Sequence, residues 1–142
     1  MTHWDERFMR LAQEIASWSK DPRTKVGCVV VRPDRTIAAT GFNGLPRGMD
    51  DSAHVLNNRP LKHKLVLHAE ENAILSSREP LLGYTLYSTV LPCSQCACRI
   101  IQAGITRVVA PGAPEGSNEL LDYEMTVRIL NQCGVAYEVS NS

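Results

Sequence analysis

The sequence predicts an α/β fold, in which helices flank a five-stranded mixed sheet as a three-layer α/β/α arrangement, in one domain over residues 1–142. Three observations predict it. Two short β-branched runs near the start are separated only by a turn, which indicates an antiparallel hairpin. The later half alternates strand and helix patterns, and such connections imply parallel strands with right-handed crossovers. A chain of this length buries about two thirds of its unfolded surface, enough for a core without disulfides.

The first elements are a helix and the hairpin. The helix is expected over residues 3–18, from steps of three and four between its apolar residues Phe8, Leu11, Ile15 and Trp18. Pro22 marks the break after it. A strand over 26–31 is rich in valine, and a second over 36–42 follows the turn Arg-Pro-Asp-Arg. These two strands form the predicted hairpin.

The remaining elements follow a stretch without visible period over residues 44–67, which is predicted to be a long loop. The pattern then predicts, in order, a helix over 69–77, a strand over 84–90, a helix opened by Pro92 at its first position and closed by Gly104, a strand over 105–110, a helix over 117–131 and a strand over 135–139. The candidate core positions of the last helix are Leu120, Leu121, Val127 and Leu130.

Charge and hydropathy exclude several classes of protein. Fifteen Lys and Arg residues balance fifteen Asp and Glu residues, so the chain lacks the basic excess typical of general nucleic-acid binders. No apolar run approaches the ~18 residues needed to cross a bilayer, and the N-terminal pattern is unlike a signal peptide. Five cysteines, an odd number, fit a reducing compartment. We expect a cytoplasmic protein that binds neither membrane nor, stably, nucleic acid.

Residues of metal-ligand type open two predicted helices. Cys93 and Cys96 share one face of a helix, and the helix dipole favours the thiolate form that binds zinc. His68 supplies a third ligand, and three protein ligands leave a fourth tetrahedral position open, as in catalytic zinc sites. Glu70 lies two residues after His68, and the two side chains can converge on one ion only at the first turn of a helix.

Together these residues match the pattern of zinc deaminases that act on nucleobases, His-x-Glu followed by Pro-Cys-x-x-Cys. The alternative is a closed structural zinc site, for which Cys98 is the candidate fourth ligand. Cys98 faces the other side of the helix from Cys96, which disfavours this alternative. The simplest interpretation of the other cysteines is that they are small apolar core residues: Cys28, Cys98 and Cys133.

Over nearly the whole chain the sequence resembles the deoxycytidylate (dCMP) deaminases of the cytidine deaminase superfamily. The resemblance rests on SKDPRTKVGCVVV, GFNGLPRG, HAEENAIL, PCSQCACRIIQAGITRVV and the closing LLDYEMTVRILNQCGVAYEV. It implies the cytidine deaminase-like fold and the hydrolysis of dCMP to dUMP and ammonia with catalytic Zn²⁺, which feeds dTMP synthesis. Glu71 stands where Leu is common, Phe42 stands where Tyr is usual, and residues 50–66 match poorly.

The implied mechanism makes Glu70 the acid–base catalyst, while zinc activates the water that attacks C4 of the base. Glu70 carries the proton to N3 and helps to protonate the departing amine. Ala69 is expected to donate its N–H to the base O2, and carbonyls near 89–91 to accept from the amino group. Asn43 matches a residue that contacts the sugar or base, although a turn residue before Gly44 is the alternative.

The resemblance also implies a receptor for the 5′-phosphate of the nucleotide. The candidates form one polar run beside the first strand: Ser19, Lys20, Arg23, Thr24 and Lys25. Such a run is otherwise a solvated loop.

Regulation is the last implied property, since members of the family are commonly hexamers activated by dCTP and inhibited by dTTP. The stretch after Asn43 carries the cations Arg47, Arg59, Lys62, His63 and Lys64. These could hold a triphosphate, while a carboxylate helps to keep Mg²⁺. The expected effector residues are Gly44, Arg47, Gly48, Asp50, Asp51, His63 and Lys64. The alternative is a mobile polar loop.

Two other functions remain open at this point. A tRNA adenosine or other polynucleotide or nucleoside deaminase shares the metal motif, but the balanced charge and the lack of a basic, aromatic tail disfavour a polynucleotide substrate. A zinc-stabilised binding module without catalysis has no need of an acid at Glu70.

Overall fold

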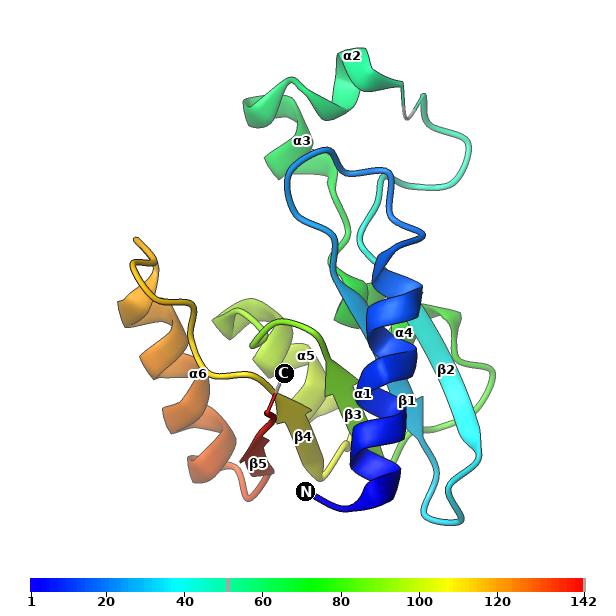
Figure 1. The fold of residues 1–142 in the computed structure, drawn as a ribbon, viewed down its shortest axis with the longest axis vertical. Coiled ribbons are helices and arrows are strands. Elements are labelled where there is room, and N and C mark those ends of the chain that lie inside the picture. Colours follow the sequence, from blue (N-terminus) through cyan, green and yellow to red (C-terminus); the bar gives the residue numbers. More distant parts are fainter. Residues whose placement is uncertain (51, 142) are drawn as a thin grey trace.

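The computed structural model describes residues 1–50 and 52–141. Its strands are β1 (Gly27–Val31), β2 (Ile37–Phe42), β3 (Thr85–Ser88), β4 (Arg107–Ala110) and β5 (Ala136–Val139). They form one five-stranded sheet in the order β2-β1-β3-β4-β5 (Figure 1). β1 pairs antiparallel with β2 and β3, whereas β4 pairs parallel with β3 and β5. The predicted mixed sheet, with its opening hairpin and parallel second half, is confirmed.

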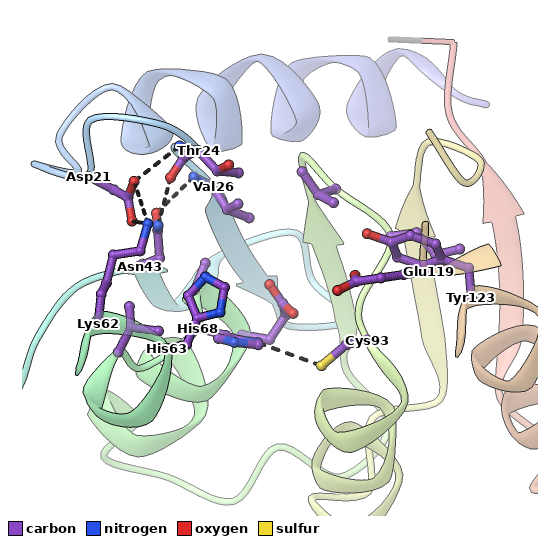
Figure 2. Close-up of a pocket in the computed structure, with 15 residues that line it drawn as sticks. Asp21, Thr24, Val26, Asn43, Lys62, His63, His68, Cys93, Glu119 and Tyr123 are labelled. Atoms are coloured by element: carbon purple, nitrogen blue, oxygen red, sulfur yellow. Dashed lines mark hydrogen bonds and ion pairs between the residues drawn. The ribbon is translucent and has the colours of Figure 1, made fainter. Parts of the chain in front are cut away.

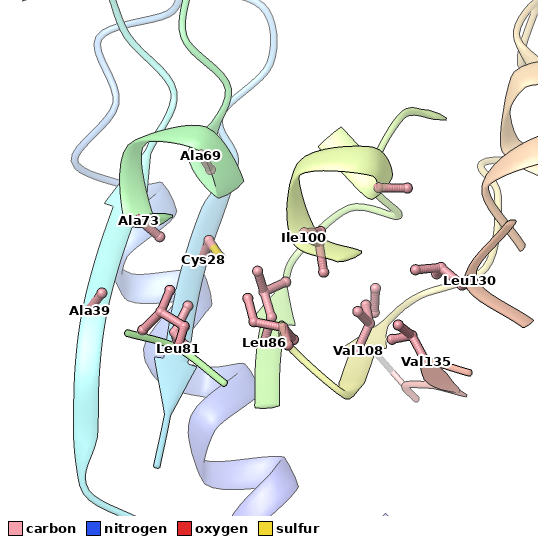
Figure 3. Packing of buried hydrophobic residues seen from close by; sticks show 14 of the residues in the cluster. Cys28, Ala39, Ala69, Ala73, Leu81, Leu86, Ile100, Val108, Leu130 and Val135 are labelled. Carbon is pink, nitrogen blue, oxygen red and sulfur yellow. The ribbon is translucent and has the colours of Figure 1, made fainter. Parts of the chain in front are cut away.

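Helices cover both faces of this sheet, so the predicted three layers are confirmed. α1 (His3–Ala16) packs on one face. α4 (Ala69–Ser76), α5 (Ser94–Gln102) and α6 (Leu120–Gln132) pack on the other. Figure 3 shows residues of these three helices above the sheet residues that they cover. β1 is buried along its whole length because successive side chains enter opposite cores, which explains its continuous apolar run.

Two glycines allow helices to approach the hairpin. A Cβ atom on Gly27 would lie 1.9 Å from the backbone oxygen of Ala12 in α1, and one on Gly41 would lie 2.4 Å from the backbone oxygen of Ala69 in α4. Any side chain at Gly41 would therefore push the start of α4 away from the sheet.

The N-terminal helix is shorter than predicted. Thr2 caps it by accepting from the backbone N–H of Asp5, and Phe8 and Ile15 are buried as expected. The helix ends at Ala16, so Trp18 lies beyond it and is 54% exposed. Its predicted place on the apolar face of the helix was therefore wrong, and its ring lies edge-on against Phe42.

The predicted long loop over 44–67 was also wrong in part, because it contains α2 (Ala53–Leu56) and α3 (Arg59–Leu65). Helices of four and seven residues are too short to reveal a period in the sequence. The side chain of Asn58 caps α3 by accepting from the N–H of Leu61. Both helices stand away from the sheet, above the loop that follows α1 (Figure 1).

The termini of α5 differ slightly from prediction. Cys93 is the N-cap, so Pro92 lies one residue before the cap and not at the first helical position. Gly104, with a φ of +87°, follows the C-cap Ala103 and ends the helix as predicted.

The last helix and the cysteines required further corrections. Leu130 is buried and Val127 packs against the core, but Leu120 and Leu121 are 48% and 81% exposed. These two leucines form the first turn of α6, which precedes the part of the helix that packs on the core. Of the three cysteines expected in the core, Cys28 is buried, whereas Cys98 and Cys133 are exposed. Among the described residues, no helix is both long and apolar enough to cross a membrane.

Candidate active site

The three predicted metal ligands meet where α4 and α5 begin. His68 is the N-cap of α4, Cys93 is the N-cap of α5, and Cys96 lies one turn into α5. Nδ1 of His68 lies 3.2 Å from Sγ of Cys96 and 3.6 Å from Sγ of Cys93. Within the described chain these three form the group whose donor atoms, all within 4.8 Å of one another, suit one ion.

This group fits zinc. Tetrahedral ligation at the usual Zn–N and Zn–S lengths separates a histidine nitrogen from a thiolate sulfur by about 3.6 Å. The observed separations of 3.2 and 3.6 Å are close to that value. Cys98 is exposed, so the expected exclusion of this residue from the ligand set agrees with its position. With three protein donors, one tetrahedral position remains for water or substrate.

The two ligand thiols behave as a pair. Their mutual hydrogen bond lowers the pKa of Cys93 and raises the pKa of Cys96. The hydrogen bond to Cys93 raises the pKa of His68. A divalent cation among these atoms would favour the thiolate form of both cysteines, since thiolate is the form that binds metal.

Glu71 joins the starts of the two ligand-bearing helices. Its Oε1 accepts the backbone N–H of His68 at 2.9 Å, and its Oε2 lies 3.1 Å from Nε of Arg99 in α5. The carboxylate thus satisfies an N–H at the start of α4 while it is paired with a cation of α5. Sequence reasoning noticed Glu71 only as a departure from the resembled family.

α6 braces the start of α5 from the other side. Asp122 accepts both the backbone N–H and the hydroxyl of Ser94, at 3.0 and 2.5 Å. The Thr126 hydroxyl is fully buried and donates to the carbonyl of Pro92 at 2.9 Å. Asp122 thus satisfies the N–H of Ser94, one of the first-turn donors of α5 that have no partner within the helix.

Glu70 is buried beside the metal ligands. It is 4% exposed, and the Ser88 hydroxyl at the end of β3 lies 3.4 Å from its Oε1. The same hydroxyl donates to the carbonyl of Val90 at 2.7 Å. Burial raises the pKa of Glu70 above its ordinary value, which favours a carboxyl group that exchanges protons near neutral pH.

A pocket of about 350 Å³ opens over these residues (Figure 2). His68, Ala69, Glu70 and Cys93 line it beside Val90 and Leu91. To one side of these residues the pocket is lined by Asp21, Thr24, Asn43, Lys62 and His63. To the opposite side it is lined by Glu119 and Tyr123. The volume suits a ligand the size of a nucleotide.

A family profile described as the cytidine and deoxycytidylate deaminase zinc-binding region matches residues 2–111. The chain belongs to this family. An uncharacterized deaminase from the luxG 3′ region of Aliivibrio fischeri is 44% identical over 115 residues, which cover 81% of this chain and 77% of that protein. The probable deoxycytidylate deaminase of Drosophila melanogaster is 37% identical over 147 residues, covering 96% of this chain and 71% of that protein.

A solved structure is similar over almost the full length. The dCMP deaminase of cyanophage S-TIM5, in complex with dCMP and dUMP, has a TM-score of 0.77 and 30% identity, with 99% of each chain covered. The fold of the present deaminase is therefore the cytidine deaminase-like fold that was expected, and the protein is an enzyme of the zinc deaminase family.

The predicted phosphate residues of this deaminase lie mostly outside its pocket. Of the five, Thr24 lines it. The Ser19 hydroxyl donates to the carbonyl of Asn43, and Nζ of Lys25 donates to the carbonyl of Ser19 at 2.6 Å. Lys20 and Arg23 are exposed and do not belong to the pocket lining. Among the predicted phosphate residues of this hydrogen-bonded loop, Thr24 is the one that lines the pocket.

Asn43 lines the pocket, but its amide also holds the neighbouring loop. Its Oδ1 accepts the N–H of Val26 at 2.9 Å and its Nδ2 donates to the carbonyl of Thr24 at 2.8 Å. These bonds give the Asn43 side chain a structural role, as the turn-residue alternative expected. Its partners, however, are the backbone groups of Val26 and Thr24 and not those of a turn before Gly44. Contact with substrate remains a prediction for this side chain.

The predicted effector residues are spread over several surroundings. Gly44 pairs with Leu67 in an isolated bridge, Gly48 has a φ of +82°, and Asp50 accepts from Ser52. Arg47 and Lys64 are exposed. Asp51 lies outside the described residues. His63, in contrast, lines the same pocket as His68, Glu70 and Cys93.

Seven pocket residues were not assigned to the active site from the sequence: Asp21, Val26, Lys62, His63, Val66, Glu119 and Tyr123. Lys62 was considered only as an effector cation. Asp21 belongs to SKDPRTKVGCVVV, one of the stretches that carried the resemblance. Its position in that motif was the feature of the sequence that could have marked it as a site residue. Glu119 and Tyr123 lie at the start of α6, where nothing in the local sequence indicates a site.

Proposed function

We propose that this deaminase hydrolyses dCMP to dUMP and ammonia. The observation that carries the proposal is the arrangement at the base of the pocket, where buried Glu70 lies beside two thiols and an imidazole suited to zinc. The similarity to the cyanophage enzyme, which binds dCMP and dUMP, supports the choice of substrate. Probable deoxycytidylate deaminases from animals support it further.

The residues that would hold zinc are His68, Cys93 and Cys96. When bound, zinc lowers the pKa of a coordinated water and so supplies a nucleophile at neutral pH. Glu70 accepts the proton of that water and delivers it to N3 of the ring as C4 is attacked. Its raised pKa suits both halves of this transfer. Glu70 then takes the remaining proton, from the new C4 hydroxyl, and gives it to the amino group as the C4–N bond breaks, so that ammonia leaves and C4 keeps a carbonyl oxygen.

Backbone groups orient the base against Glu70. The N–H of Ala69 belongs to the first turn of α4, whose N–H groups have no partner within the helix, so it is suited to donate to the base O2. Val90 and Leu91 line the pocket beside Glu70, and the Leu91 carbonyl is a candidate acceptor for the amino group. The Val90 carbonyl already accepts from Ser88. Asn43, whose side chain is fixed by its bonds to the loop, contacts the sugar in this proposal.

An ammonia-release assay tests the proposal directly. The zinc-loaded protein is given dCMP, CMP, deoxycytidine, dCTP and an RNA stem-loop that contains adenosine. We expect the largest kcat/KM with dCMP, and loss of activity on removal of zinc. Release from the RNA alone would replace the proposal with a polynucleotide deaminase, and retention of zinc with no release from any substrate would favour a binding module.

The wider role proposed for the enzyme follows its relatives. We propose that dUMP formed in the cytoplasm feeds dTMP synthesis, with dCTP as activator and dTTP, with Mg²⁺, as inhibitor. A homo-oligomer, a hexamer by family resemblance, is compatible with large apolar side chains at the surface, since Leu75, Leu82 and Leu121 are 69%, 71% and 81% exposed. Steady-state rates with millimolar dCTP or dTTP test the effectors, and sedimentation velocity tests the assembly.

A further inference from the structure

The pocket of this deaminase carries its cations on one side. Of the side chains in its described lining, Lys62, His63 and His68 can bear positive charge, and His68 is directed at the ligand thiols. Glu119 stands on the opposite side. We propose that Lys62 and His63 of α3 form the subsite for the 5′-phosphate of the nucleotide, an inference that rests on the proposed function.

Lys62 is the main element of this subsite. It is 5% exposed although it belongs to a short helix that stands away from the sheet. Its Nζ lies 3.1 Å from Oδ2 and 3.3 Å from Oδ1 of Asp21. An ammonium group has three N–H donors, and the contacts recorded for it in the described chain go to this one carboxylate. At least one donor therefore remains for a ligand in the pocket that Lys62 lines.

Asp21 orients the lysine. Its Oδ1 also accepts the N–H of Arg23 at 2.8 Å and the N–H of Thr24 at 3.1 Å. The carboxylate thus carries two amide donors as well as the ammonium, which together offset much of its negative charge. Asp21 fixes Nζ of Lys62 at the pocket wall before a ligand binds. A flexible surface lysine would instead lose conformational entropy on binding, which would weaken its affinity for the ligand.

His63 adds a second donor that is closer to the metal ligands. It follows Lys62 on α3 and lines the same pocket. In Figure 2 its ring lies between His68 and the Lys62–Asp21 pair. This order matches a nucleotide whose base sits at Glu70 and whose phosphate extends away from it. The opposite orientation would bring a phosphate dianion to Glu119, where like charges repel.

The experiment compares a substrate with its analogue that lacks phosphate. Zinc-loaded wild type, Lys62→Gln and His63→Gln are assayed for kcat/KM with dCMP and with deoxycytidine. A charge-assisted hydrogen bond to phosphate is worth roughly 10- to 100-fold in affinity. We expect Lys62→Gln to lower kcat/KM for dCMP by about that factor, and His63→Gln by about tenfold or less, with deoxycytidine changed less than threefold. Arg128→Gln, which removes an exposed cation of α6, serves as the charge-matched control.

Binding of the product gives a readout without turnover. Calorimetry with dUMP and deoxyuridine should give the same selective loss in the Lys62 variant. His63 is exposed, so its variant keeps the test valid if Lys62→Gln folds poorly. Equal losses for both ligands, or no loss in either variant, would overturn the subsite and leave the proposed function standing. A selective loss in Arg23→Gln instead would move the subsite to the loop after α1. A wild type that prefers deoxycytidine, or acts on neither substrate, would overturn the proposed function and the subsite with it.

Discussion

The two ends of the pocket are held together in different ways. At the metal-ligand end, the starts of α4 and α5 lie on the sheet and are braced by Glu71, Asp122 and Thr126. At the other end, α2 and α3 stand off the sheet, and the bridge between Gly44 and Leu67 and the ion pair between Lys62 and Asp21 attach them.

The difference separates chemistry from selection. Ligand atoms and an acid–base group must be held to within a fraction of an ångström, which secondary structure on a packed core provides. A group that recognises the distal part of a substrate tolerates a less rigid support. We therefore expect substitutions at the braced end to abolish the reaction, and substitutions at the α2–α3 end to change substrate preference and local stability.

The largest effect is expected from Cys93→Ala. Removal of one of three protein ligands should strip the zinc and lower activity below detection, because the remaining two donors hold the ion weakly. Metal content by mass spectrometry and ammonia release should fall together. Cys98→Ala is the matched control, since Cys98 is exposed on the same helix. Loss of zinc from the control would mean that the ligand set is wrong and the site is structural.

Glu70→Gln should give the next largest effect. The amide has the shape of the carboxyl group but cannot carry the proton, so turnover should fall by about 10²–10⁴-fold or more, with zinc retained. The free energy of unfolding should not fall, because a neutral amide costs less to bury at this position than a charged carboxylate. Rates are compared at equal zinc occupancy. Activity within tenfold of the wild type would remove Glu70 from the mechanism.

Asp21→Asn addresses the other end of the pocket. It leaves the Lys62 ammonium buried without its anion, and breaking a buried pair costs about 3–5 kcal/mol. We expect faster amide hydrogen exchange in α3 and unchanged exchange in α5. Equal changes in both helices would show that the two ends are not mechanically distinct.

The ionisation of Asp21 predicts that α3 also loses stability in acid while α5 does not. Burial alone would raise the pKa of Asp21, but the N–H groups of Arg23 and Thr24 and the Lys62 ammonium together lower it. Because the pKa is lower in the folded state, this stabilisation is present above the unfolded value of about 3.9 and is lost as the pH falls below it. The protection factors of the α3 amides in the wild type, which correct for the slower intrinsic exchange in acid, should fall as the pH drops below about 3.9. The Asp21→Asn protein should lack this step.

The sequence predicted the two ends unequally. The predicted ligands His68, Cys93 and Cys96 lie together because His68 and Cys93 each stand at the start of a helix, Cys96 follows one turn later, and ligand type and spacing are encoded locally. The Lys62–Asp21 pair joins residues 41 apart, one in a loop and one in a helix too short to show a period. No local pattern specifies such a contact. The exposed Leu120 and Leu121 were misassigned for a related reason, since hydrophobic spacing does not tell where a helix leaves the core.

The smallest effect is expected at Glu71, whose carboxylate joins the starts of α4 and α5. Glu71→Gln keeps an acceptor for the His68 N–H but weakens the pair with Arg99, whose side chain is 49% exposed. Since exposed ion pairs contribute about 0.2–1 kcal/mol, zinc affinity should fall only a few-fold. Glu71→Ala also removes the acceptor, and loss of a group that orients a metal ligand costs about 10- to 100-fold in affinity. We therefore expect a smaller loss of zinc affinity in the Gln variant than in the Ala variant. Competition with a chromophoric chelator measures both losses, and Glu124→Gln, at an exposed position of α6, is the control. If the Ala variant binds zinc as tightly as the wild type, the carboxylate braces the helices without positioning His68, and the rigidity of this end comes from Asp122 and the core.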